Sequence, residues 1–146
     1  MKELIIGNQA FQRAASLYIR YSVFVLEKHI KRDEEFDDKD VSDTCYAVLY
    51  DHSEPVSTAR FLPEIATEAR ITRVATLSKH RGKGYGAQII RAMEKYAQKE
   101  GYHVLVIHSE LSAKSFYETL GYKAKGQVYL EDGQACQTLE KHIGDS

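Results

Sequence analysis

The stretch "SKHRGKGYGAQII" (residues 78–90) combines basic side chains with three glycines, directly before an apolar helical pattern. The apolar run "EARITRVATL" before it predicts a strand at residues 68–77, and Ile89, Ile90 and Met93 predict a helix that begins near Gly84. The first turn of a helix carries unpaired backbone N–H groups, and glycine lets an anion come close to the main chain. The loop is therefore predicted to bind an anionic group.

The rest of the chain alternates predicted strands and helices without an internal repeat or linker. Helical spacing of Phe11, Ala14, Ala15, Tyr18 and Ile19 predicts a first helix with these residues on one face. We predict strands at residues 2–7, 44–51, 55–63, 68–77, 103–108, 122–130 and 134–142, and helices at 9–30, 84–100 and 112–121. This order, β-α-β-β-β-α-β-α-β-β, indicates an α+β (mixed α/β) fold.

Composition limits the classes of protein that fit. A length of 146 residues suits one domain, residues 1–146, and a net charge of -1 argues against a nucleic-acid-binding protein. The first residues contain only a short apolar run, so we expect no signal peptide and no association with a membrane. Two isolated cysteines, Cys45 and Cys136, fit a reducing compartment, and a cytoplasmic location is expected.

Several anion sites are compatible with the loop alone. The P-loop string G-x-x-x-x-G-K-[ST] does not occur. A dinucleotide fingerprint G-x-G-x-x-A is met by Gly82, Gly84 and Ala87, with Glu110 just past the next strand. The pattern R/Q-x-x-G-x-G/A is also met, from Arg81 to Gly86, and a basic connection without any ligand is the simplest interpretation.

A second motif selects among these interpretations. In "HSELSAKSFYETLGYK" (residues 108–123), the pattern A-x-x-F-Y is followed by a glycine–aromatic pair, at Ala113, Phe116, Tyr117, Gly121 and Tyr122. With both motifs in this order, the chain resembles the GNAT family of N-acetyltransferases. The segments "YSVFVLEKHIKRDEEFDDKD" and "YLEDGQACQTLEK" resemble its ElaA-like branch, so the resemblance covers most of the chain.

This resemblance implies a central mixed, mostly antiparallel sheet flanked by helices, with a splay between its central strands. It also implies transfer of an acetyl group from acetyl-CoA directly to a primary amine of a small molecule or a peptide. The alternative is a non-catalytic acyl-CoA-binding module that senses the level of the cofactor. The two terminal strands could pair between subunits, which would give a homodimer.

The resemblance also implies roles for individual residues. Tyr117 would be the catalytic residue, as a hydrogen-bond donor to the leaving thiolate. Val74, Ala75 and Thr76 would lie along the pantetheine arm, where the splay leaves backbone groups of Val74 and Thr76 unpaired. The remaining cofactor-binding residues implied are Arg81, Gly82, Lys83, Gly84, Tyr85, Gly86 and Phe116.

Two features have competing interpretations. Tyr117 shares a helical face with Ala113, Phe116 and Leu120, which is also the pattern of a core residue. The segment 31–43 contains seven acids, which is typical of a solvated loop, although it could instead recognise a cationic amine. Candidate general bases are Glu27, Glu34, Glu35, Asp37 and Asp40. The histidines show no metal-ligand spacing, so no metal is predicted.

Overall fold

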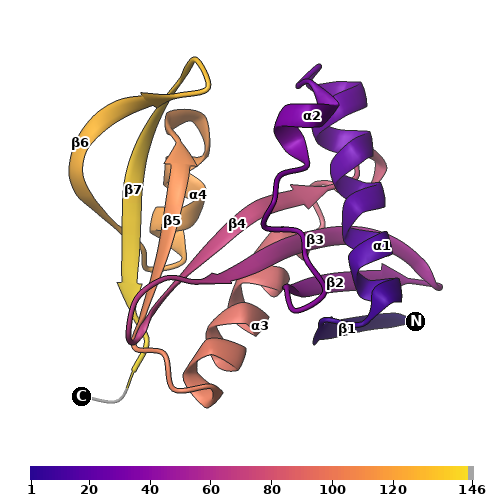
Figure 1. Cartoon of the computed structure of the whole chain (residues 1–146), viewed down its shortest axis with the longest axis horizontal. Coiled ribbons are helices and arrows are strands. Elements are labelled where there is room, and N and C mark those ends of the chain that lie inside the picture. The colour runs from indigo at the N-terminus through magenta and orange to yellow at the C-terminus, as the bar shows by residue number, and fades with distance from the viewer. Residues whose placement is uncertain (145–146) are drawn as a thin grey trace.

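A computed structural model describes residues 1–144 of the chain (Figure 1). The elements follow the predicted order. They are β1 (Lys2–Gly7), α1 (Ala10–Arg20), η1 (Tyr21–Glu27), α2 (Arg32–Glu35), β2 (Cys45–Asp51), β3 (Glu54–Pro63), β4 (Glu68–Thr76), η2 (Ser78–His80), α3 (Tyr85–Lys99), β5 (Val104–Glu110), η3 (Leu111–Ala113), α4 (Lys114–Thr119), β6 (Lys123–Glu131) and β7 (Gln134–His142).

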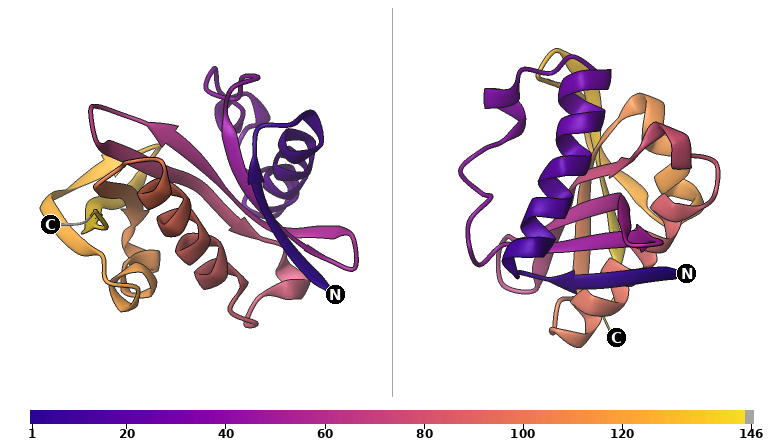
Figure 2. Two further views of the ribbon diagram at one scale, coloured as in Figure 1. Left: turned by 90° about the horizontal axis from the view of Figure 1, so that it is seen from below. Right: turned by 90° about the vertical axis from the view of Figure 1, so that its right-hand side faces the viewer.

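The strands form a seven-stranded sheet within the described residues, in the order β1-β2-β3-β4-β5-β7-β6. Neighbouring strands are antiparallel except β4 and β5, which are parallel and are joined through α3. Helices α1 and α3 lie on opposite faces of the sheet (Figure 2). The predicted α+β class, with a mostly antiparallel sheet flanked by helices, is confirmed.

Strands β4 and β5 stay together for only a short distance and then separate (Figure 1). Their pairing runs from Glu68 opposite Val104 to Arg70 opposite Val106. Beyond that point, β4 continues to Thr76 and β5 to Glu110 with no ladder between them. The predicted splay between the central strands is therefore present.

A β-bulge in β4 lies just beyond the last paired residue. Thr58 of β3 pairs with Ala75, but Arg60 pairs with Thr72, so two residues of β4 stand opposite one residue of β3. One of the two is Arg73, whose φ of 55° lies in the left-handed region. A bulge bends its strand and increases the local twist. It therefore accounts for the departure of β4 from β5 at this position.

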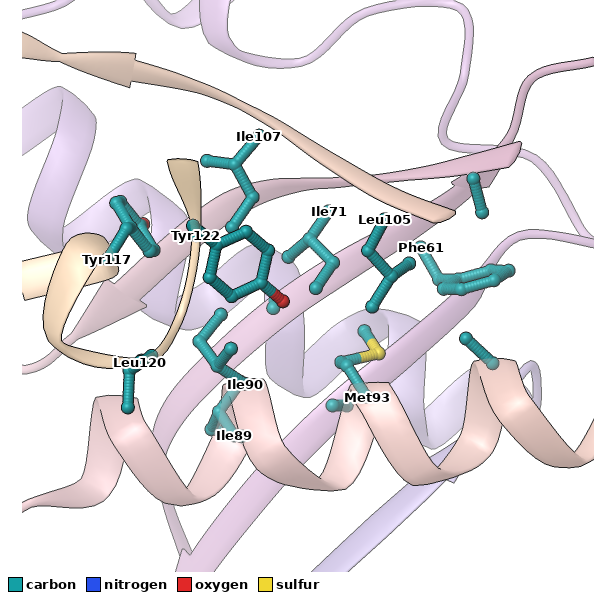
Figure 3. Packing of buried hydrophobic residues seen from close by; sticks show 14 of the residues in the cluster. Phe61, Ile71, Ile89, Ile90, Met93, Leu105, Ile107, Tyr117, Leu120 and Tyr122 are labelled. Carbon is teal, nitrogen blue, oxygen red and sulfur yellow. The ribbon is translucent and has the colours of Figure 1, made fainter. Parts of the chain in front are cut away.

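The main hydrophobic core lies between the sheet and α3. Ile89, Ile90 and Met93 of α3 face Ile71 of β4 and Leu105 of β5, and all five are buried (Figure 3). The same cluster continues to Tyr117, Leu120 and Tyr122. Because this core spans both diverging strands, α3 holds the two halves of the sheet together on this face.

The buried face of α1 combines Ile19, as predicted, with polar side chains that the predicted apolar face did not include. Phe11 and Tyr18 are 50% and 49% exposed, whereas Gln12, Ser16 and Arg20 are fully buried. Gln12 donates through Nε2 to the carbonyl oxygen of Ile5, and Ser16 accepts a hydrogen bond from Thr58. The apolar spacing identified the helix and the buried Ile19 correctly but misplaced Phe11 and Tyr18, because hydrogen bonds to the sheet let polar side chains take their place.

The first helix is also shorter and less regular than predicted. Residues 9–30 were expected to form one helix, but α1 ends at Arg20 and the chain continues as the π-helical segment η1 to Glu27. The next short helix, α2, lies within the segment predicted to be loop. A π-helical turn inserts one extra residue in the hydrogen-bonded ring and so rotates the chain after it.

Two acids of segment 31–43 are buried and a third, Asp37, is only partly exposed, which corrects the expectation of a solvated loop. Glu35 is 3% exposed and accepts a hydrogen bond from Arg20 Nε at 2.9 Å. Asp40 accepts one from Arg20 Nη1 at 2.7 Å. With Asp37, these acids contact three arginines in one cluster, here called the arginine–carboxylate network: Arg20, Glu35, Asp37, Asp40, Arg60 and Arg73.

This network connects segment 31–43 to α1, to β3 and to the bulge of β4. Arg60 Nη1 lies 2.7 Å from Asp37 Oδ1, and Arg73 Nε lies 3.1 Å from Glu35 Oε2. Burial disfavours the ionised form of Asp40, but hydrogen bonds from Arg20 and Tyr46 outweigh burial and lower its pKa to about 2. The charged state of Asp40 therefore stabilises the fold.

Asp40→Asn tests this contribution. We expect the substitution to lower the free energy of unfolding at neutral pH by about 2–4 kcal/mol, because it leaves buried guanidinium groups incompletely paired. The stabilisation by Asp40 is present above its unfolded pKa of 3.8 and is lost as the pH falls toward about 2. The wild type should therefore lose stability more steeply than the variant over this range.

Urea unfolding between about pH 2 and pH 7 measures both effects. Asp38→Asn is the matched control, because Asp38 lies exposed in the same segment. Equal stability of the Asp40 and Asp38 variants would contradict the assignment.

Candidate active site

A cleft of about 720 Å³ occupies the space between the diverging strands. Its two walls are residues 70–74 of β4 and residues 107–110 of β5. The loop 28–31 and α2 border it on one side, and the turn between β6 and β7 borders it on the other. Tyr117 of α4 also lines it. The cleft therefore exists because the sheet lacks a ladder at this point.

The two sides of the cleft differ in charge. Arg70 and Arg73 lie on the β4 side. Glu110, Glu131 and Asp132 lie on the side formed by β5 and the β6–β7 turn. A ligand in the cleft would thus meet arginines on the β4 wall and carboxylates on the β5 side, with groups of both signs along the loop 28–31 and α2.

The glycine loop follows β4 and leads into α3. Gly82 and Gly84 have φ values of 79° and 80°, a conformation that glycine adopts without strain. Gly84 is the residue immediately before α3, with no side chain capping the helix. Tyr85 is buried and its hydroxyl lies 3.4 Å from Asp51 Oδ2, so only its backbone faces the loop. The loop therefore offers main-chain N–H groups and open space at the start of α3.

Arg81 of this loop is already engaged by a carboxylate. Its Nη1 and Nη2 donate to Glu27 at 2.6 and 2.7 Å, and its Nε donates to the carbonyl oxygen of Thr76 at 3.0 Å. The pair is partly exposed, and the hydrogen bond from Arg81 lowers the pKa of Glu27. Glu27, a candidate base from the sequence, is thus the ion-pair partner of Arg81. Lys83 of the same loop is exposed.

The backbone of β4 past Arg70 has a free edge toward the cleft. Leu77 donates its N–H to Val56 of β3, so alternation along the strand directs Val74 and Thr76 to the opposite edge. Ala75 pairs with Thr58, and its carbonyl oxygen accepts from Ser57. The geometry therefore directs Val74 and Thr76 toward a ligand, with the Thr76 carbonyl already accepting from Arg81, while the Ala75 backbone faces β3.

Tyr117 is both a core residue and a residue of the cleft, so its position is compatible with both interpretations of its sequence pattern. It is 7% exposed and belongs to the core cluster, yet it also lines the cleft. Burial, with a smaller contribution from Glu110, raises the pKa of Tyr117 to about 12. Its ring packs edge-to-face on Phe116, and a Cβ at Gly86 would lie 3.4 Å from Phe116. The two sequence motifs therefore meet at this contact.

Comparison with known proteins agrees with this geometry. The acetyltransferase (GNAT) domain matches residues 21–143. The chain belongs to the GNAT family of acetyltransferases.

Several members of the family are similar over most of their length. An uncharacterized acetyltransferase of Streptococcus pyogenes is 52% identical over 110 residues, which are 75% of each chain. The crystal structure of a candidate N-acetyltransferase from Lactobacillus plantarum is 37% identical and superposes with a TM-score of 0.94, over 97% of this chain and 98% of the other. Escherichia coli ElaA shares the fold, with 23% identity and a TM-score of 0.84 over 97% and 100% of the two chains.

GNAT membership decides between the interpretations of the glycine loop. GNAT proteins use acyl-CoA, so the pattern from Arg81 to Gly86 is a better description than the dinucleotide fingerprint. In this GNAT domain, β4, α3 and β5 make a single parallel unit within a mostly antiparallel sheet, unlike a doubly wound nucleotide-binding fold. No helix in the described part of the chain is long and apolar enough to cross a membrane.

The GNAT cleft also contains residues that the sequence did not single out. His108 of β5 and Arg70 of β4 both line it, and each has a buried nitrogen without a hydrogen-bond partner. A lone histidine at the end of an apolar strand gives no local signal of function. Among residues 1–144, no group of three or more potential ligands is arranged to hold a metal ion.

Proposed function

We propose that this GNAT protein transfers an acetyl group from acetyl-CoA directly to a primary amine of a small molecule or a peptide. The observation that carries the proposal is the cleft between β4 and β5, which is lined by the loop 28–31 and α2 at one end and by Ala113 and Tyr117 at the other. A donor and an acceptor can approach from the two faces and meet where the ladder is missing.

The residues present fit an acyl-CoA on the side of α3. The backbone from Gly82 to Gly86 would hold the pyrophosphate, with Arg81 and Lys83 neutralising its charge. The free edge of β4 at Val74 and Thr76 would pair with amide groups of the pantetheine arm. Phe116 would pack beside the arm, and the bound thioester supplies the activated acetyl group.

The acidic wall of the cleft supports an amine as the acceptor. Glu110, Glu131 and Asp132 would attract the protonated form, which predominates in solution at neutral pH. The amine must then become neutral before it can attack. For a lysine-like amine with a pKa of ~10.4, deprotonation at pH 7 costs roughly 4–5 kcal/mol, which the site must offset.

Tyr117 would act on the departing sulfur. Because the pKa of a thiol is ~8.5, a phenol is a weak acid toward a thiolate. The pKa of Tyr117, raised to about 12 by burial, strengthens this argument. Tyr117 would therefore stay protonated and stabilise the developing thiolate charge by donating a hydrogen bond.

A panel of amines tests the proposed function. The full chain is incubated with acetyl-CoA and putrescine, tyramine, L-lysine or a peptide with a free N-terminus, and free thiol is measured. Amine-dependent thiol release is the expected result. Thermal stabilisation by acetyl-CoA without release for any amine would instead identify the non-catalytic acyl-CoA-binding module.

Glu27→Gln is expected to strengthen binding of coenzyme A. The Glu27–Arg81 pair is partly exposed, and pairs of this kind contribute about 0–1 kcal/mol. Freeing Arg81 for the pyrophosphate should therefore tighten binding by up to about fivefold. Isothermal titration calorimetry with coenzyme A measures the change. Glu3→Gln, an exposed site on β1, controls for the altered net charge. Weaker binding by the Glu27 variant would mean that Glu27 positions Arg81 and does not compete for it.

Tyr117→Phe is expected to lower turnover at least about tenfold while coenzyme A still binds. The substitution keeps the packed ring and removes only the hydroxyl, which is needed when thiolate charge develops. Initial rates of thiol release with the best acceptor of the panel measure the loss, and calorimetry measures binding. Tyr18→Phe, at a half-exposed position on α1, is the control. Unchanged turnover would remove Tyr117 from the mechanism.

A further inference from the structure

We propose that His108 is the general base that accepts a proton from the acceptor amine, and that Glu131 orients its ring. This inference rests on the proposed acetyl transfer and adds to it the identity of the base.

His108 stands on the face of β5 that the acceptor would approach. Its neighbours Leu105 and Ile107 are buried in the core against α3, so alternation along the strand directs His108 to the opposite face. The side chain is 27% exposed and lines the cleft. It is therefore accessible to a ligand and still fixed on a central strand.

The surroundings of the ring distinguish its two nitrogens. Nδ1 is buried without a hydrogen-bond partner and lies 3.7 Å from Glu131 Oε1. The Tyr129 ring packs edge-to-face on the imidazole at 6.0 Å and limits its rotation. A small approach of the carboxylate would let Nδ1–H donate to Glu131, which leaves the Nε2 lone pair for the substrate. Catalytic hydrogen bonds are often longer before the substrate is bound.

The surroundings of His108 lower its pKa. Burial is the largest cause that lowers its pKa, and Arg70 of β4 lowers it further. Glu131 of β6 and Glu64, just after β3, act in the opposite direction but do not outweigh them. Tyr129 is the titratable group that packs directly against the ring. A histidine whose pKa lies below its usual range is unprotonated at neutral pH, as a base must be.

The proton transfer balances without a further reactant. The ammonium group of the acceptor gives one proton to Nε2 and becomes an amine with a free lone pair. The amine nitrogen forms the bond to the acetyl carbon as the carbon–sulfur bond breaks. A second amine proton neutralises the departing thiolate, and the imidazolium returns its proton to water.

Two acids that the sequence suggested as bases are less suited to this role. Glu35 is 3% exposed, and both Arg20 and Arg73 contact its carboxylate. Glu27 is held by two hydrogen bonds from Arg81. The hydrogen bonds from Arg81 lower the pKa of Glu27 and make it a weak base. Burial raises the pKa of Glu35, but its carboxylate is covered and already paired with two arginines, so an amine cannot reach it. His108 has no arginine hydrogen-bonded to it.

His108→Gln tests the assignment through the pH profile of turnover. With the best acceptor of the amine panel, the wild type should lose activity as the pH falls through the pKa of His108. The variant should lose roughly 10²-fold or more in kcat and should lack this acidic limb. Binding of coenzyme A should be unchanged. His142→Gln is the matched control, because His142 also lies 3.7 Å from a glutamate but is 78% exposed and outside the cleft.

Two further substitutions should move the acidic limb in opposite directions. Glu131→Gln removes a charge that favours the imidazolium, so the limb should move to lower pH, by roughly half to one unit. Arg70→Gln removes a charge that disfavours it, so the limb should move to higher pH. Arg70→Lys keeps the charge and should leave the limb in place. Loss of packing alone would not produce shifts of opposite sign.

The tautomer provides a measurement that does not depend on turnover. In ¹⁵N-histidine spectra at neutral pH, His108 should carry its proton on Nδ1 and none on Nε2. If the wild type releases thiol and His108→Gln keeps the same acidic limb, this inference is overturned and the proposed function is not. A proton on Nε2 of His108 at neutral pH would have the same meaning. Absence of thiol release from the wild type with every amine would overturn the proposed function, and this inference with it.

Discussion

The separation of β4 from β5 is the constraint on which the other features of the site depend. Three residue pairs join the strands before the bulge at Arg73 turns β4 away. Without this departure, the edge of β4 would be paired and the cleft would be filled by a regular sheet. The core beneath α3 keeps both strands attached to the same layer, so the sheet opens on the ligand side without losing its packing.

The bulge that separates the strands is strained at Arg73, and contacts to segment 31–43 stabilise it. A non-glycine residue at positive φ costs roughly 1–2 kcal/mol, and Arg73 is such a residue. Its guanidinium donates to the backbone carbonyl of Glu35 and contacts the carboxylates of Glu35 and Asp37. Segment 31–43 thus anchors the bulge. Its acids form part of the scaffold beside the cleft, whereas the carboxylates for a cationic ligand come from the other wall.

The sequence was sufficient for features whose determinants are local or follow a fixed spacing. Helical periodicity located α3, and the paired glycine and A-x-x-F-Y motifs indicated the splay and the family. The arginine–carboxylate network could not be predicted from the sequence, because Arg20 and Glu35 are 15 residues apart and Arg73 and Asp37 are 36 apart. Nothing in an acidic run shows that arginines elsewhere will cover it. The polar part of the buried face of α1 was missed for the same reason, since Gln12 and Ser16 find their partners on the sheet. His108 acquires its neighbours from β6 only when β6 pairs with β7 and β7 pairs with β5.

Position 73 should tolerate few substitutions, because its backbone and its side chain impose opposite demands. The backbone conformation favours glycine, which would relieve the strain but remove every contact to segment 31–43. Lysine would keep the charge, but an ammonium group lacks the planar fork that reaches a backbone carbonyl and two carboxylates together. Arg73 thus occupies a position where local propensity argues against arginine, and the path of β4 along the cleft depends on the contacts that this side chain makes with segment 31–43.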